Sequence, residues 1–305
     1  MAQGMTMTVC SHAYSGKKAH VCALARESIT VLTLSAAAVL VAATPVNVNA
    51  ASTTSVPMRL HGTEAPVVIV RVQGRELPLQ LDLGDASSLV LHPEVLATLR
   101  SEPTADTFKA FSMDGKIDTP IVRLDLVEIG SLKLFGVVAR QDVHDEAYRN
   151  YKKTELGAVG FVGTGLFKSG QIRLDYSRTR LTISLPQGTG AVCNVCRGQA
   201  VPIVENKWGL TTAVSTDAGE LQLGWDTGAP AILVSRSTAS AANLAADLDS
   251  TEFKKFVVGG RNFGPQRIEI WNIPLPTEIA GLIGYPFFRE HVVCLDYPRL
   301  TLRIQ

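Results

Sequence analysis

The stretch LGWDTGAPAILVS, Leu223 to Ser235, places one carboxylate between two runs of apolar residues. Before the acid, Leu221, Leu223 and Trp225 alternate with other residues, which is the pattern of a strand that buries one face. A buried Asp costs free energy unless its charge is satisfied, shared or used in chemistry. The stretch therefore predicts either a tight turn or a functional site at Asp226.

A similar stretch occurs earlier in the chain. The sequence DLGDASSLVLH from Asp82 aligns without a gap with DTGAPAILVSR from Asp226. Leu77, Leu79 and Leu81 alternate before Asp82, so this acid also follows a strand with one apolar face. Two acids in the same local pattern favour a site over a turn.

A second pair of segments aligns further along the chain. The sequence GFVGTGLFKSGQIRLDYSRTRLTI, residues 160–183, matches GLIGYPFFREHVVCLDYPRLTLRI, residues 281–304, without a gap. The shared positions include two glycines, a Phe and an Asp-Tyr pair. Repeats of this kind decide the fold, so the chain is predicted to contain two copies of one unit.

Each copy predicts short strands and hairpins around an acid-bearing loop, followed by a glycine block and two final strands. Helices are expected only at residues 93–99 and 237–248 and after each glycine block. This pattern predicts an all-β fold. We expect residues 51–185 to form an N-terminal lobe, 186–200 a Gly- and Pro-containing linker, and 201–305 a C-terminal lobe.

These motifs resemble the aspartic peptidases, specifically the bacterial retropepsin-like proteins fused in tandem into a pepsin-like two-lobed chain. The resemblance covers residues 65 to 305 and implies a two-lobed acid-protease β-barrel fold with intramolecular pseudo-twofold symmetry. In that family each lobe contributes an Asp-Thr-Gly loop, backed by two apolar residues and a glycine. The matching residues are Asp82, Gly84, Phe161, Val162 and Gly163 in the first lobe, and Asp226, Thr227, Gly228, Leu282, Ile283 and Gly284 in the second.

The resemblance implies that Asp82 and Asp226 form a catalytic pair. Two carboxyl groups a few ångströms apart share one proton, so one can take a proton from water while the other polarises the peptide carbonyl. The function we expect is therefore that of an aspartic endopeptidase acting on peptide or protein substrates, with no metal and no cofactor. Gly84 and Gly228 would let the two loops approach closely.

The first loop departs from the family pattern at two positions. Leu83 stands where the family has Thr, and its side chain makes no hydrogen bond. Asp85 follows Gly84 and would either raise the pKa of the catalytic pair or point to solvent. The alternative function is therefore a catalytically impaired pseudopeptidase that binds extended peptides.

Two hairpins are candidates for flaps that cover the substrate. The first has its turn at Asp114 and Gly115, and the second at Gly259 and Gly260. Glycine at a hairpin tip gives a flap the mobility to open for a polymer.

Residues 1–50 have the layout of a signal peptide: basic residues, an apolar run from Ile29 to Ala43, and small residues before Ala51. An uncleaved anchor is the alternative, but the run is short for a membrane span. We therefore expect export to the periplasm or medium, with no stable membrane insertion after cleavage. The net charge of +1 makes nucleic acid an unsuitable partner, and two acids in one chain predict a monomer.

Three of the five cysteines lie beyond the leader, and two of them form the motif CNVC. A zinc half-site lacks a second ligand pair, and the flanking sequence is unlike a thioredoxin active site. In an oxidising compartment we expect a local disulfide between Cys193 and Cys196, with free thiols as the alternative.

Overall fold

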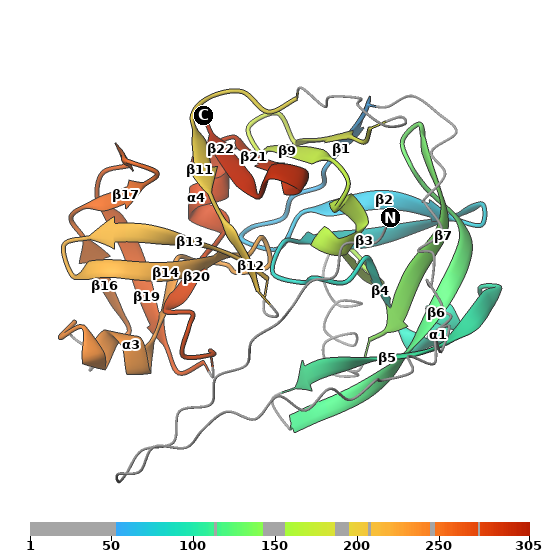
Figure 1. Ribbon diagram of the computed structural model, residues 1–305, viewed down its shortest axis with the longest axis horizontal. Coiled ribbons are helices and arrows are strands. Elements are labelled where there is room, and N and C mark those ends of the chain that lie inside the picture. The colour runs from blue at the N-terminus through green and yellow to red at the C-terminus, as the bar shows by residue number, and fades with distance from the viewer. Residues whose placement is uncertain are drawn as a thin grey trace, which may run out of the picture. The chain divides into compact units, whose positions relative to one another are not determined.

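The computed structural model describes residues 53–112, 115–142, 156–186, 195–206, 209–244, 248–273 and 275–305, and the strand counts below refer to them. They form mainly β-structure in two lobes (Figure 1). Residues 1–50, Cys193 and Asp114 lie outside this part of the chain. Within it, no helix combines the length and the apolar character needed to cross a membrane.

The first lobe is built on a seven-stranded sheet of order β2-β3-β8-β4-β7-β6-β5. Strand β2 also pairs with β6, so the sheet closes toward a barrel. The strands are β2 (Val67–Val72), β3 (Arg75–Asp82), β4 (Leu89–Leu91), β5 (Ser101–Ser112), β6 (Gly115–Ile129), β7 (Leu132–Gln141) and β8 (Gly160–Gly163), and helix α1 (Pro93–Leu96) follows β4.

The second lobe has a nine-stranded sheet of order β16-β19-β15-β20-β14-β13-β17-β18, with β12 paired to β13. Its strands are β12 (Val204–Asn206), β13 (Gly209–Thr216), β14 (Gly219–Trp225), β15 (Leu233–Ser235), β16 (Ser250–Phe253), β17 (Phe256–Val258), β18 (Arg261–Asn262), β19 (Gln266–Trp271) and β20 (Gly281–Ile283). Helix α3 (Arg236–Ala241) is shorter than the sequence pattern predicts, since Asn243 adopts a left-handed conformation just beyond it.

A third, six-stranded antiparallel sheet takes strands from both halves of the chain, in the order β1-β10-β9-β21-β22-β11. Its members are β1 (Thr53–Pro57), β9 (Gln171–Asp175), β10 (Arg180–Ser184), β11 (Ala200–Pro202), β21 (Val293–Asp296) and β22 (Thr301–Ile304). Short helices precede and join these strands: η1 (Thr164–Phe167), α4 (Tyr285–Glu290) and η2 (Tyr297–Arg299). The middle pair is β9 and β21, one from each half.

The two acid-bearing strands have the same surroundings in both lobes. Strand β3 runs parallel to β8, as β14 runs parallel to β20. Strands β4 and β15 run antiparallel to β8 and β20, respectively. They also run parallel to β7 and β19. The predicted pseudo-twofold arrangement is therefore present in the pairing of the strands.

The apolar faces predicted before each acid are buried. Leu79 and Leu81 of β3 and Leu223 of β14 are fully buried, and Trp225 is 1% exposed. Trp225 packs edge-to-face on the rings of the α4 helix beneath the second lobe. These strands therefore hold the acid loops on a packed core rather than on a mobile surface segment.

The disulfide prediction is wrong in its partner. Cys196 bonds to Cys294 of β21, 98 residues away, and not to Cys193. Hydrogen bonds explain the choice, because Val195 N–H donates to Gln171 Oε1 of β9, which lays the segment along the six-stranded sheet. Cys196 thereby lies over Cys294, with their Cα atoms 5.4 Å apart. The short spacing of CNVC favoured a local pair, but the position of residues 195 and 196 along the six-stranded sheet brings Cys196 next to Cys294 instead.

Candidate active site

The two acids lie at equivalent points, Asp82 at the end of β3 and Asp226 directly after β14. Each carboxyl accepts a hydrogen bond from the glycine two residues on: Gly84 N–H to Asp82 Oδ1 at 2.8 Å and Gly228 N–H to Asp226 Oδ1 at 2.7 Å. The sequence therefore folds both acids into the same turn, with each side chain aimed along its loop.

The two loops meet at their glycines. A Cβ on Gly84 would lie 2.9 Å from Asp226 Cγ, and one on Gly228 would lie 3.8 Å from Asp82 Cγ. A real side chain at Gly84 would therefore overlap the opposite acid, which explains why the loop needs glycine. Both carboxyl groups line one cavity, and the charge of Asp226 raises the pKa of Asp82, so the two acids are close enough to titrate as a pair.

Burial raises the pKa of both carboxyl groups. The pKa of Asp82 rises well above its usual range, because the negative charges of Asp226 and Asp85 and the hydrogen bond to Asp226 add to the effect of burial. For Asp226, the N–H groups of Gly228 and Ala229 offset part of the rise in pKa. Both shifts favour the protonated form, so the pair is suited to hold a proton between the two acids.

Both loops are fixed from behind by the backing motifs predicted from the sequence. A side chain on Gly163 would overlap the carbonyl oxygens of Ser87 and Asp85, and one on Gly284 would overlap the carbonyl oxygen of Ala229. Val162 and Ile283 are fully buried beside these glycines. Each glycine block therefore lies directly against the acid loop of its own lobe.

The second loop braces the first through one hydroxyl. Thr227 Oγ1 accepts from Leu83 N–H at 3.0 Å and donates to the carbonyl oxygen of Leu81 at 2.6 Å. Thr227 is fully buried, so both bonds are shielded from water. The Leu83 side chain makes no hydrogen bond to the second loop, because it is apolar and fully buried in the core. The brace is therefore one-sided.

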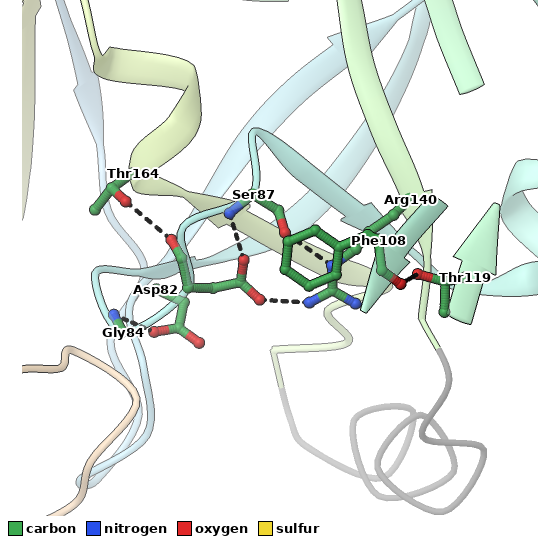
Figure 2. Close-up of polar contacts among 8 residues, drawn as sticks. Asp82, Gly84, Ser87, Phe108, Thr119, Arg140 and Thr164 are labelled. Carbon is green, nitrogen blue, oxygen red and sulfur yellow. Dashed lines mark hydrogen bonds and ion pairs between the residues drawn. The ribbon is translucent and has the colours of Figure 1, made fainter. Parts of the chain in front are cut away.

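Asp85 neither points freely to solvent nor is left unpaired. Its Oδ2 forms an ion pair with Arg140 Nη2 at 2.5 Å, and its Oδ1 accepts from Ser87 N–H at 2.6 Å. The guanidinium of Arg140 also lies over the ring of Phe108 (Figure 2), 4.8 Å from the ring centroid. The charge of Asp85 still contributes to the raised pKa of Asp82, as the sequence predicted.

One cavity contains the acid pair, and a second lies beside the first acid loop. The first, about 380 Å³, has both acids in its lining, and the other lining residues are Thr63, Glu64, Ala65, Gln80, Phe161, Gly228 and Pro230. The second, about 310 Å³, adjoins the first acid loop, and its lining residues are Ala86, Ser87, Ser88, Leu89, Phe108, Ile121, Val138, Ala139, Arg140, Gly165 and Lys168. The first cavity therefore reaches both acids, and the second lies beside the loop that carries Asp82.

One of the two expected flaps is a long hairpin beside the site. Strands β5 and β6 pair from Ser101 to the tip, where Ser112 faces Gly115. Phe108 of β5 and Ile121 of β6 line the second cavity, so this hairpin borders the space next to the acids.

The second expected flap, the turn at Gly259 and Gly260, does not lie over the site. Gly259 and Gly260 do form a tight turn, between β17 and β18. A Cβ on Gly259 would overlap Val201 of β11, however, so this turn packs on the six-stranded sheet. Its structural equivalent in the first lobe is the turn at Gly130, which packs in the same way on Thr54 of β1. The Gly-Gly pair serves a tight turn with positive φ rather than a mobile cover.

Sequence reasoning missed three side chains of the site: Glu64, Gln80 and Arg140. Gln80 had a signal, since it lies two residues before Asp82 and therefore on the same face of the strand, opposite the face that carries the leucines. Glu64 and Arg140 had none, because they come from a loop and a strand far along the chain. Within the described residues, no group of three or more His, Cys, Asp or Glu is arranged to hold a metal ion.

No known protein family matches the sequence, and no curated protein matches it either. The structure does match solved ones. Aspartic proteinase from Irpex lacteus superposes with a TM-score of 0.52 over 83% of this chain and 96% of the other, at 13% identity. The fold is that of the pepsin-like aspartic proteinases. At this identity the likeness concerns the fold alone, so function has to be argued from the site.

Proposed function

We propose that the chain is an exported aspartic endopeptidase with Asp82 and Asp226 as its catalytic pair. The observation that carries the proposal is the meeting, in one cavity, of two buried carboxyl groups that are each held by the N–H of their own loop glycine and whose pKa values are raised. The signal-peptide layout of residues 1–50 supports export. The sequence match between the two halves supports a chain of the bacterial tandem retropepsin-like type, complete as a monomer.

The geometry suggests a division of roles. Asp226, whose charge is favoured by two N–H donors, takes a proton from a water molecule held between the acids. The water oxygen attacks the peptide carbonyl carbon while Asp82 donates its proton to the carbonyl oxygen. The C–N bond of the tetrahedral diol then breaks, the proton on Asp226 passes to the leaving nitrogen, and one hydroxyl returns its proton to Asp82 as the C=O bond forms again. The pair returns to its singly protonated state.

The test uses the purified full-length protein and a peptide library scanned from about pH 3 to about pH 7. We expect cleavage in the acidic range that a statine-type inhibitor blocks. Asp226→Asn should lose at least about a thousandfold in kcat/KM. The exposed Asp125→Asn variant serves as the control. Cleavage that survives Asp226→Asn or the inhibitor would overturn the proposal.

A second candidate function is peptide binding without hydrolysis, which the one-sided brace at Leu83 favours. A pseudopeptidase would bind extended peptides saturably and cleave none at any pH. Restoring the family pattern with Leu83→Thr and Asp85→Ala would then leave peptide affinity nearly unchanged, as calorimetry can measure. A large loss of affinity would contradict this function.

A further inference from the structure

The cavity that holds the acid pair has an unusual balance of charge. Among the described residues that line it, three are acidic, namely Glu64, Asp82 and Asp226, and none is Lys, Arg or His. The catalytic acids share one proton, so Glu64 adds a negative charge that this pair does not need for hydrolysis. A cavity of one charge sign attracts ligands of the other sign.

Glu64 has an oxygen that is out of water and unused. Its Oε2 is buried and has no hydrogen-bond partner in the described part of the chain. Glu64 as a whole is half-buried and lines the cavity, so its carboxylate can accept from a ligand that supplies an N–H. The backbone N–H of Glu64 donates to the carbonyl oxygen of His61, which fixes this residue in a turn at the rim of the cavity.

Two neighbours suit a long basic side chain. Gln80 is only 5% exposed and lines the cavity with a side chain that can accept from an ammonium or guanidinium group. Phe161 pairs with Gln80 across β3 and β8 and lines the same cavity. An apolar surface beside two acceptors fits the methylene stem and charged head of Lys or Arg.

The second cavity differs from the first in the charge of its lining. It also contains Arg140 and Lys168, but their charges are already compensated, by Asp85 and by Glu205, respectively. Its remaining lining is mostly small or apolar, including Phe108 and Ile121. A side chain in the first cavity meets carboxylates, whereas one in the second meets a mostly apolar lining.

We propose that the site selects peptides with a Lys or Arg side chain next to the scissile bond, seated in the first cavity against Glu64. This inference rests on the proposed function, because it names the substrate class of that site. Glu64 is then a specificity residue, which binds the substrate side chain and takes no part in bond cleavage.

The test compares peptides that differ only in one residue flanking the cleaved bond, placed in turn on each side as Lys, norleucine or Glu. We expect Lys to exceed norleucine by about tenfold in kcat/KM on one side only. Glu64→Gln should reduce that ratio to within about twofold, through a loss of Lys cleavage that exceeds any change in norleucine cleavage. Glu64→Lys should reverse the preference toward Glu. The exposed Glu220→Gln variant of the second lobe is the matched control.

Three outcomes separate this inference from the function on which it rests. Cleavage without a preference for Lys, or a preference unaffected by Glu64→Gln, overturns the inference and leaves the endopeptidase standing. Absence of cleavage overturns the endopeptidase, and hydroxyethylene peptide analogues carrying Lys or norleucine then decide the inference by calorimetry. Tighter binding of the Lys analogue that Glu64→Gln abolishes supports it, whereas equal affinity or no binding overturns it.

Discussion

The loop at Asp226 and the loop at Asp82 have the same backbone design but different side chains. In both, the residue two positions after the acid donates to its carboxyl, and a glycine block lies behind. Only the second loop contributes a bracing hydroxyl, and only the first has an additional ion pair, Asp85 with Arg140. The two loops therefore share the backbone contacts that hold each acid, whereas the bracing hydroxyl and the ion pair each occur in one loop.

This difference teaches that the two lobes need not be equal to place two acids equally. The close approach at Gly84 and Gly228 depends on strand pairing and on the absence of Cβ atoms. Thr227 then fixes the first loop through Leu83 N–H, while the core fixes the rest of Leu83. Substitutions in the two loops can test which supports matter.

The largest expected effect is the loss of activity when either catalytic acid is replaced, and it should be the same for both loops. Asp82→Asn should lower kcat/KM as severely as Asp226→Asn, at least about a thousandfold, because a pair that shares one proton acts as a unit. Steady-state cleavage of one library peptide measures both. A loss at Asp82 more than about tenfold smaller than at Asp226 would break the proposed equality.

The next effect concerns the brace. Thr227→Val keeps the shape of the side chain but leaves Leu83 N–H without its acceptor, which should cost about 1–3 kcal/mol of unfolding free energy. We also expect kcat to fall about tenfold or more, since the two acids lose their fixed spacing. Denaturant unfolding and cleavage kinetics measure these effects.

Thr212→Val is the matched control for the brace, because this buried hydroxyl bonds to Pro202 away from the acids. It should destabilise the fold without changing kcat. If both variants changed kcat equally, the brace would have no special role in the site.

A smaller effect should follow from the ion pair beside the first loop. Asp85→Asn removes a negative charge that raises the pKa of both acids, so their shared proton is lost at lower pH. The alkaline limit of activity should therefore move down, by less than about one pH unit. Arg140→Gln leaves Asp85 uncompensated and should move the limit up. Shifts of the same sign in the two pH profiles would contradict this electrostatic account.

The smallest effect is expected where the first loop is restored to the family pattern. Leu83→Thr loses buried apolar area, which costs about 1–3 kcal/mol. It gains a hydroxyl able to bond across to the second loop, which returns about 0.5–1.5 kcal/mol per bond. We expect unfolding free energy within about 2 kcal/mol of the wild type and kcat changed less than threefold. A rise in kcat of about a hundredfold would mean that the one-sided brace limits catalysis.

The sequence predicted those features that depend on local pattern. The alternating Leu residues predicted the strand before Asp82, because alternation follows from burial of one face. The glycine blocks predicted the segments behind each acid, because close approach requires glycine. It did not predict the partner of Cys196 or the place of Gly259, since both depend on how the six-stranded sheet is assembled from distant segments. Glu64 enters the site from a loop whose sequence has no periodicity to indicate where it lies.

The sheet shared between the two halves also bears on how this chain can be divided. Strands β9 and β21 pair at its centre, so cutting the chain between the halves would leave each fragment with an unprotected strand edge. Antiparallel pairing allows β9 to bond to a second copy of itself about a twofold axis. A fragment of the first half would then be expected to associate as a symmetric dimer, with two copies of the Asp-Leu-Gly loop facing each other and no threonine hydroxyl to join them.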